Sequence, residues 1–383
     1  MKYYLISILI VFLALAACDD KVNDSQLIQV DLTDRHKTIQ YNLNEYVSDL
    51  NLIRLETNNT SLIRYFRGHV GENYIIALER DRILLFNSAG RYIKTIAKKG
   101  KGPGEFAQID AWVVDEKENF FLYHDVGKDY ICNYNLNKQQ WEENIPFEDH
   151  GYLSRMVLVN DTTLSILPGM FTQYGYLFFN QTLSGHITGG VFKENIPHPG
   201  SWSGKSPAFK KTPDNSIVFQ ASECDTVYRI DGNNMSPLYF LLVDKPKKNG
   251  NVTTGSYVSY LHSDENQLLI TRIGYETVST HNSVSTSGTE AEYVCIDLKT
   301  MEISRFDSFQ LQVNDIELKV KNISFPNRDE IIITCPAPDF KKAVNEALVK
   351  TDLDDREKER LRQLDSEIYE ADNPILITGN WKR

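Results

Sequence analysis

The sequence predicts an all-β protein, and two observations support this prediction. Between residues 27 and 338, short apolar or alternating runs such as 74–78 and 82–86 are separated by turn-forming segments such as 87–90. Runs of this kind, bounded by Gly, Asn, Asp and Ser, are typical of β-strands. No helical periodicity is visible before residue 339. This excludes a fold in which strands and helices alternate.

A weak internal repeat extends the prediction from fold class to architecture. An aromatic or aliphatic run leads into a short polar turn at 86–90, 134–138, 179–185, 228–232 and 296–300. The spacing is roughly 45–50 residues, longer before the last repeat, and suits a propeller blade of four strands. Dividing roughly 280 residues by this spacing predicts a six-bladed β-propeller. The longer interval contains a Ser/Thr-rich segment, 277–289, which we expect to be a loop insertion.

Both ends of the chain are expected to belong to one propeller domain, 27–383. Strands within 27–55 are candidates for closing the ring, because a blade shared by the two termini leaves no exposed sheet edge. Apolar residues recur at helical spacing after 338, so 339–371 is expected to form a small C-terminal helical element. The range 375–378 is expected to be a final strand. The helical element is expected to cap the ring, with docking of a partner as the alternative.

The N-terminus carries a secretion signal. Lys2 precedes a short apolar run, which ends in Leu-Ala-Ala-Cys at 15–18. These features are typical of a signal peptide, here 1–17, and the run is shorter than the ~20 residues that span a bilayer. The small residues before Cys18 resemble a bacterial lipobox, which implies that Cys18 becomes a lipidated N-terminus and that 18–26 contains a flexible tether. The protein is then expected at the outer membrane, on its periplasmic face or at the cell surface.

The net charge limits the possible partners. The formal net charge is −11 at pH 7. Nucleic acids and anionic lipid headgroups both require a basic surface. We therefore expect no nucleic-acid partner, and contact with the membrane through the lipid anchor.

Four cysteines remain besides Cys18, and no two of them form a C-x-x-C pair; they are Cys132, Cys224, Cys295 and Cys335. The simpler interpretation is that they are buried free thiols. One or two disulfides remain open as an alternative, because an exported protein meets an oxidising environment. No metal site is predicted, because the spacing of metal ligands is absent.

A glycine-rich segment, 100–104, supplies the first candidate binding residues, Lys99, Lys101 and Glu105. The segment lacks the G-K-[ST] ending of a phosphate-binding loop. Its glycines permit a tight connection between blades. Alternatively, its backbone N–H groups and lysines could form a lip that accepts an anion.

His124, Asp125 and Trp202 are the remaining candidates. A His-Asp pair can orient a base or bind a metal, although at the end of a strand it can also simply form a turn. Trp202 lies among Gly, Ser and Pro residues. It could stack on a sugar ring or cover the edge of a blade. No H-x-H, H-E-x-x-H or G-x-S-x-G motif is present, so no metal, cofactor or hydrolase nucleophile is predicted.

The segment 85–106 reads LFNSAGRYIKTIAKKGKGPGEF. It resembles the first blade of the six-bladed β-propeller lipoproteins of Bacteroides-type bacteria, which are related to NHL and TolB-like propellers. Asn87 stands where the pattern of that family more often has Asp. Segments 201–207, 225–230 and 372–376 also resemble the family. The resemblance covers nearly the whole mature chain and implies fold and compartment. It transfers no catalytic residue, because the function of the family is unknown.

We expect a non-catalytic binding or scaffold protein that holds a glycan, a peptide or an envelope protein. The site would lie at the mouth of the central channel, where the loops of a propeller converge. The alternative is a hydrolase, lyase or lactonase whose polar residues come from several blades and leave no motif. A convergent set of Asp, Glu, Asn and His would favour the enzyme.

Overall fold

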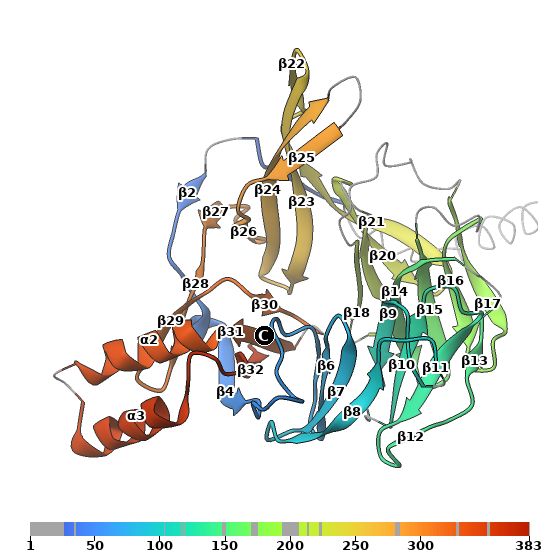
Figure 1. The fold of residues 1–383 in the computed structure, drawn as a ribbon. Helices are drawn as coiled ribbons and strands as arrows, with labels where there is room; N and C mark the ends of the chain where they lie inside the picture. The colour runs from blue at the N-terminus through green and yellow to red at the C-terminus, as the bar shows by residue number, and fades with distance from the viewer. Residues whose placement is uncertain are drawn as a thin grey trace, which may run out of the picture.

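The fold is a series of small antiparallel β-sheets that follow one another in chain order (Figure 1). The computed structural model describes residues 27–33, 36–102, 104–115, 117, 119–147, 151–169, 175–193, 207–212, 214–221, 224–279, 284–326, 329–350 and 353–382. Within these ranges the protein is mostly β, as the sequence predicts.

The first three sheets each contain four successive strands. Sheet I is formed by β5 (Gly68–Val70), β6 (Tyr74–Leu78), β7 (Arg82–Asn87) and β8 (Tyr92–Lys98). Sheet II is formed by β9 (Ile109–Val114), β10 (Phe120–Asp125), β11 (Tyr130–Asn135) and β12 (Gln140–Trp141), with β13 (Ile145–Pro146) beside β11. Sheet III is formed by β14 (Leu153–Asn160), β15 (Thr163–Pro168), β16 (Tyr176–Thr182) and β17 (Ile187–Phe192).

The next three sheets keep this four-stranded unit, and sheets IV and V add strands to it. Sheet IV is built on β18 (Ala208–Lys211), β19 (Ile217–Gln220), β20 (Thr226–Asp231) and β21 (Asn234–Leu242). Sheet V is built on β23 (Val252–Ser263), β24 (Gln267–Ser279), β26 (Glu292–Asp297) and β27 (Ile303–Phe306), with β22 (Lys247–Asn249) and β25 (Val284–Gly288). Sheet VI is formed by β30 (Ile323–Ser324), β31 (Glu330–Cys335), β32 (Ile375–Trp381) and β4 (Val47–Arg54).

The five repeats seen in the sequence are the hairpins between the third and fourth strands of sheets I to V. Gly90, Gly185 and Gly232 lie in three of these turns with φ of 81°, 90° and 59°, a backbone region that only glycine enters without strain. Gln139 and Met301 adopt φ of 53° and 60° in the other two hairpins. The repeat therefore reflects one local turn geometry used five times.

The predicted loop insertion at 277–289 is partly a strand. The end of β24 pairs with β25, from Tyr275 opposite Gly288 to Ser279 opposite Val284. β24 therefore pairs with β26 along its first part and with β25 farther on, and this hairpin projects at the top of Figure 1. Thr277, Val278, Val284 and Thr286 favour these strands, because β-branched side chains favour an extended backbone.

The N-terminal segment runs along the outer edges of the later sheets. β1 (Ile28–Asp31) pairs in parallel with β21, β2 (Lys37–Thr38) with β27, and β3 (Tyr41–Asn42) with β28 (Phe309–Val313). β28 also pairs with β29 (Ile316–Val320), which makes a small three-stranded sheet. After a single 3-10 turn at Leu43–Glu45, β4 pairs antiparallel with β32. A strand from the N-terminal part, β4, and the last strand, β32, thus lie in one sheet.

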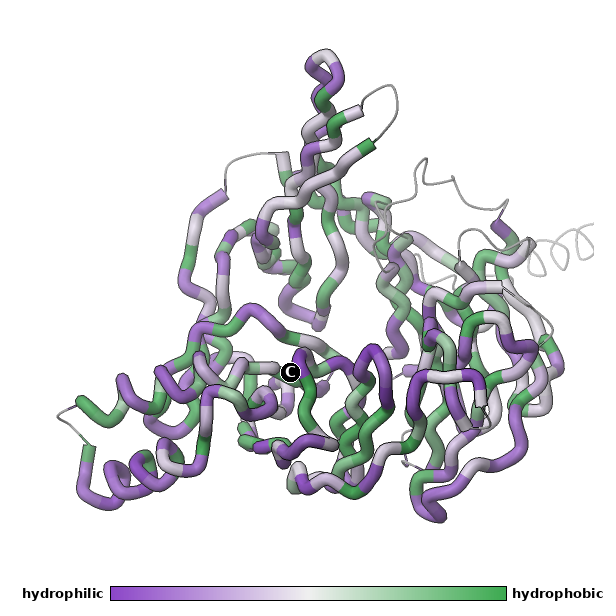
Figure 2. The backbone as a smooth tube through the Cα atoms, in the orientation of Figure 1, coloured by the Kyte–Doolittle hydropathy of each residue, from purple (hydrophilic) through white to green (hydrophobic). Residues whose placement is uncertain are grey.

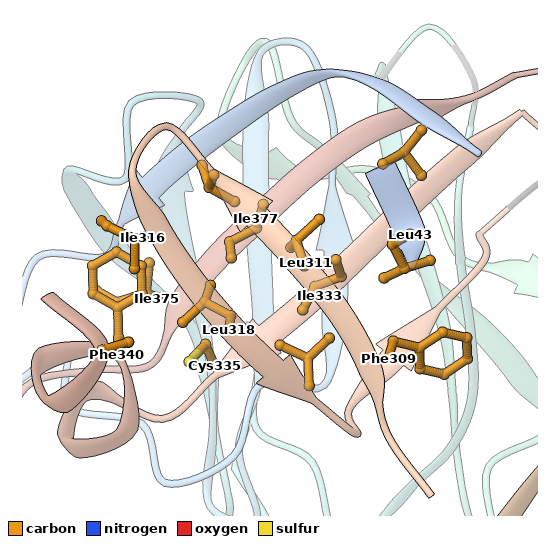
Figure 3. Packing of buried hydrophobic residues seen from close by; sticks show 14 of the residues in the cluster. Leu43, Phe309, Leu311, Ile316, Leu318, Ile333, Cys335, Phe340, Ile375 and Ile377 are labelled. Atoms are coloured by element: carbon orange, nitrogen blue, oxygen red, sulfur yellow. The ribbon is translucent and has the colours of Figure 1, made fainter. Parts of the chain in front are cut away.

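Two helices interrupt sheet VI between β31 and β32, within and next to the range 339–371 that the sequence predicts to be helical. α2 (Ala337–Leu348) buries Phe340, Val344 and Ala347, and Figure 3 shows Phe340 beside Ile316 and Ile375. α3 (Asp355–Glu367) begins with a capping box between Asp354 and Glu357 and buries Leu361. Figure 2 shows that α3 is mainly hydrophilic, so this helix covers the body with one narrow apolar stripe.

Asn373 fixes the entry into the last strand. Its side chain is fully buried, accepts a hydrogen bond from Ile63 N at 2.7 Å and donates to the carbonyls of Glu56 and Ser61 at 2.9 and 3.0 Å. These bonds hold the chain before β32 against the loop that follows β4. The segment 372–374, expected only to end a helix, therefore also joins the two ends of the chain.

The packing of β32 can be tested with a matched pair of substitutions on this strand. Leu376 is fully buried and packs with Ile53, whereas Asn380 is exposed. Leu376→Ala is expected to lower the free energy of unfolding by about 2–5 kcal/mol, the usual effect of a cavity in a packed core. Asn380→Ala is expected to change it by less than about 1 kcal/mol. Urea unfolding followed by tryptophan fluorescence measures both, and equal effects would contradict the packing described.

Candidate functional site

The glycine-rich segment holds its own carboxylate. Glu105 Oε2 accepts a hydrogen bond from Gly102 N at 2.7 Å. A Cβ atom on Gly100 would lie 1.9 Å from the same carboxylate, so a side chain at this position would displace the Glu105 carboxylate. Lys99 and Lys101 are exposed. The backbone cradle expected to accept an anion is thus occupied by Glu105 of the same chain.

Asp125 fastens this segment to sheet II. Its carboxylate accepts hydrogen bonds from Ala107 N at 2.9 Å and Gln108 N at 2.7 Å. Lys128 Nζ lies 3.0 Å from Asp125 Oδ2 and 3.3 Å from the carbonyl oxygen of Glu105. The structure therefore brings Glu105 and Asp125 together through Lys128, with Asp125 almost fully buried.

His124 points to a different partner. Its ring is fully buried, with Nδ1 2.8 Å from Asp110 Oδ1 and Nε2 3.1 Å from the carbonyl oxygen of Lys128. Asp110 also accepts hydrogen bonds from Ala111 N and from Leu153 N, both at 2.7 Å. Because Leu153 begins β14, Asp110 links sheet II to sheet III. Both ring nitrogens of His124 are committed to this link.

The remaining candidate residues are Trp202 and the five cysteines. Trp202 and Cys18 lie outside the described residues. The other four cysteines are free thiols, with Cys132 and Cys335 buried, and Cys224 and Cys295 partly exposed. Burial raises the pKa of Cys295 and of Cys335 to about 12, which makes both thiols poor nucleophiles at neutral pH.

A cleft, which the sequence does not predict, lies between sheets IV and V. We call it the inter-sheet cleft. It has a volume of about 270 Å³, and its lining residues include Lys210, Tyr239, Tyr260, His262 and Phe325. Lys210 lies on β18, on the same face as the buried Ala208, which packs against residues of β23. Its ammonium group donates to the carbonyl of Leu261 at 2.8 Å and lies 5.9 Å from the centre of the Tyr260 ring.

Positive charges gather around Lys210. Burial and the nearby charge of Arg155 lower the pKa of Lys210 to about 8. Burial, followed by the charge of Arg67, also lowers the pKa of Arg155. Arg155 lies on β14, and its guanidinium donates to the carbonyl of Ser154 at 3.2 Å. Arg155 thus lies within electrostatic range of two other cations, Lys210 on β18 and Arg67 just before β5.

The two acids of the inter-sheet cleft are engaged with other groups. Asp264 accepts hydrogen bonds from Gln267 N at 2.9 Å and from Trp381 Nε1 at 2.7 Å. Asp214 pairs with Arg229 and accepts from the hydroxyl of Ser216 at 2.8 Å. Although burial raises the pKa of Asp214, these hydrogen bonds and the Arg229 charge outweigh it and hold the pKa well below its usual range.

Aromatic rings form one wall of the inter-sheet cleft. His262 stacks on Phe325 with ring centres 4.3 Å apart and meets Trp381 edge-on at 4.8 Å. The hydroxyl of Tyr260 lies 3.0 Å from that of Ser263. The arrangement combines a positive charge, hydroxyl groups and ring faces, which together can hold a small polar ligand.

The described residues contain no group of three or more His, Cys, Asp or Glu side chains arranged to hold a metal ion. In the same ranges, no helix has both the length and the apolar character needed to cross a membrane.

These observations define a mostly β protein built of successive four-stranded sheets, with a polar cleft between two of them. The chain belongs to the family described as Domain of unknown function (DUF4934), whose model matches residues 27–380. A search of curated proteins found no match.

Several solved structures resemble this one. A Bacteroides fragilis protein designated as exported is 16% identical, covers 93% of this chain and 100% of its own, and superposes with a TM-score of 0.63. This likeness indicates a shared fold. A DUF4221 member from Bacteroides vulgatus is 11% identical, over 92% of this chain and 97% of its own, with a TM-score of 0.41. The extracellular domain of a hybrid two-component system from B. thetaiotaomicron is 13% identical, over 74% and 32%, with a TM-score of 0.43.

The link between sheets II and III gives a prediction about stability. Asp110→Ala leaves two backbone N–H groups and the His124 ring without their acceptor. Because unpaired buried donors are costly, we expect the free energy of unfolding to fall by about 3–5 kcal/mol. Asp161, whose side chain is 73% exposed and pairs with Lys117 on the surface, provides the control.

Asp161→Ala is expected to change stability by less than about 1 kcal/mol. Thermal and urea unfolding measure both variants. If the Asp110→Ala protein proves as stable as the Asp161→Ala protein, Asp110 does not hold the two sheets together.

Proposed function

We propose that the protein is a non-catalytic binding module of the bacterial outer membrane, anchored by lipid at Cys18. Its fold would be a six-bladed β-propeller, and its ligand, a glycan, a peptide or part of an envelope protein, would lie in the inter-sheet cleft. The resemblance of 15–18 to a lipobox supports the anchor. The shared fold with a B. fragilis protein designated as exported agrees with this location.

The sheet order supports the propeller. Six sheets share a unit of four strands, and in five of them the third and fourth strands form a continuous hairpin. In sheet VI the same two positions are filled by β32 and β4, from opposite ends of the chain. A shared blade of this kind would close a ring and leave no open sheet edge.

One observation favours binding over catalysis. The acidic and imidazole groups that the sequence singles out are committed to the backbone or to one another, as at His124, Asp125 and Glu105. General acid–base catalysis needs a group within hydrogen-bond reach of a substrate. By contrast, Lys210 faces a cleft and has a carbonyl as its hydrogen-bond acceptor. The polar chemistry open to a ligand is therefore cationic and suits recognition.

The anchor can be tested by fractionation. Cys18→Ser removes the residue that would carry the acyl chains, and multiple acyl chains are what give stable attachment. We expect the variant to leave the membrane fraction after carbonate or high-salt washing followed by detergent-free extraction. Cys224→Ser, a partly exposed thiol in the body of the protein, should stay with the membranes. Retention of the Cys18→Ser protein in the membrane fraction would refute the anchor.

Binding without turnover can be tested on the full-length protein purified in detergent. Calorimetric titration against a panel of monosaccharides, oligosaccharides and short peptides is expected to identify a ligand, and chromatography of the mixture should recover it unchanged. Lys210→Met is expected to weaken binding at least tenfold, while Lys248→Met, an exposed lysine on β22, leaves it unaltered. Conversion of any panel member to a product would favour a hydrolase or lyase instead. Failure of the whole panel to bind would refute the proposed function.

A further inference from the structure

We infer that the inter-sheet cleft binds a small organic anion, a ligand that carries a carboxylate or a sulfate group. The inference rests on the proposed binding function and adds the charge and size of the ligand. Four features support it, namely unpaired cations, occupied acids, the cost of the arrangement without a ligand, and the shape of the cleft.

Lys210 lines the inter-sheet cleft, and Arg155 lies within electrostatic range of it. Within the described ranges, no carboxylate forms an ion pair with Lys210, Arg155 or Arg67. Arg229, at the edge of the same cleft, shows the usual arrangement, because it pairs directly with Asp214. The positive charge at Lys210 and Arg155 is therefore a local property of the site.

The acids of the inter-sheet cleft cannot take the place of a partner without giving up other bonds. Asp264 would have to release the indole N–H of Trp381, which it holds at 2.7 Å. Asp214 would have to leave Arg229 and the hydroxyl of Ser216. Both carboxylates are thus fixed elsewhere, so neither acid of the described cleft lining balances the charge of Lys210, and an anionic ligand could do so.

The arrangement is unfavourable as it stands. Lysine is rarely buried unless it is paired, and like charges in proximity repel. The lowered pKa of Lys210 and of Arg155 has the same physical origin, burial and mutual repulsion. A bound anion would replace the lost hydration and offset the repulsion between the cations. Sites that bind a charged ligand commonly carry such an uncompensated charge when empty.

The dimensions of the inter-sheet cleft limit the ligand. Its volume of about 270 Å³ lies near the lower end of the ~300–1,000 Å³ typical of ligand pockets. The hydroxyls of Tyr260 and Ser263 offer hydrogen bonds beside the ammonium group, and the buried rings of His262 and Phe325, stacked on each other, form an apolar wall. These surroundings suit a ligand of about one sugar ring that carries a single acidic group.

A comparison of charged and neutral ligands of equal size tests the inference. The full-length protein in detergent is titrated calorimetrically with glucuronate, with glucose and with inorganic sulfate at constant ionic strength. We expect glucuronate to bind at least tenfold more tightly than glucose. If sulfate binds as tightly as glucuronate, the charge alone is recognised. If sulfate binds much more weakly, the sugar ring contributes to recognition. Either result supports an anion site.

Substitutions locate the binding and separate it from folding. Lys210→Met is expected to weaken glucuronate binding at least tenfold and to raise the melting temperature of the ligand-free protein, because an unpaired charge is removed. Arg155→Leu provides a second test if the first variant does not fold, and Lys248→Met is the surface control. Equal affinity for glucose and glucuronate, or unaltered affinity in Lys210→Met, would overturn the inference. If a neutral ligand binds in the inter-sheet cleft, the binding function survives and only the anion is excluded.

Discussion

The arrangement of this molecule depends on the pairing of β4 with β32. These strands come from opposite ends of the chain, yet they lie side by side in sheet VI and bury Ile53 and Leu376 in one cluster. Asn373 adds buried hydrogen bonds to the loop after β4. An isolated strand gains little by itself, because β-structure is stabilised by cross-strand neighbours and by a packed face. Sheet VI therefore exists only when both ends are in place, and sheets I and V gain a neighbour at the same time.

Polar groups between sheets fall into two kinds with different consequences. Asp110 and Asp125 are buried among donors that satisfy their oxygens, so they hold sheets and loops in register. Lys210 reaches across from sheet IV to the carbonyl of Leu261 in sheet V and pairs with no carboxylate of the described residues. A buried network whose polar groups are all hydrogen-bonded rigidifies a core, whereas a charge without a counter-ion can still form an ion pair with another molecule. The same inter-sheet position thus holds sheets II and III together, whereas between sheets IV and V it is the site at which we propose that a ligand binds.

The sequence predicts the features of the fold that depend on neighbouring residues, but not those that depend on contacts between distant residues. The five hairpins were recognisable because glycines at positive φ, such as Gly90, lie within a few residues of the strands that they join. The strand nature of 284–288 was missed, since it depends on the pairing with β24. His124 was linked to its neighbour Asp125, but its partner is Asp110, 14 residues earlier. The inter-sheet cleft was missed because Lys210 and Leu261 are 51 residues apart and share no motif. The one indication of the cleft in the sequence is that Lys210 lies two residues after Ala208 on a short strand, and therefore on the same, buried face.

The N-terminal segment along the edges of the later sheets has a consequence for the order of assembly. Strands β1 to β4 leave the ribosome early, but their partners β21, β27, β28 and β32 are synthesised much later. Asn373 and Thr57, for example, are joined by a hydrogen bond across 316 residues of sequence. Contacts between such distant residues slow folding, because a long loop must close before any of them forms. The N-terminal strands thus stay unpaired until their partners have been synthesised, and β4 can join sheet VI only after β32.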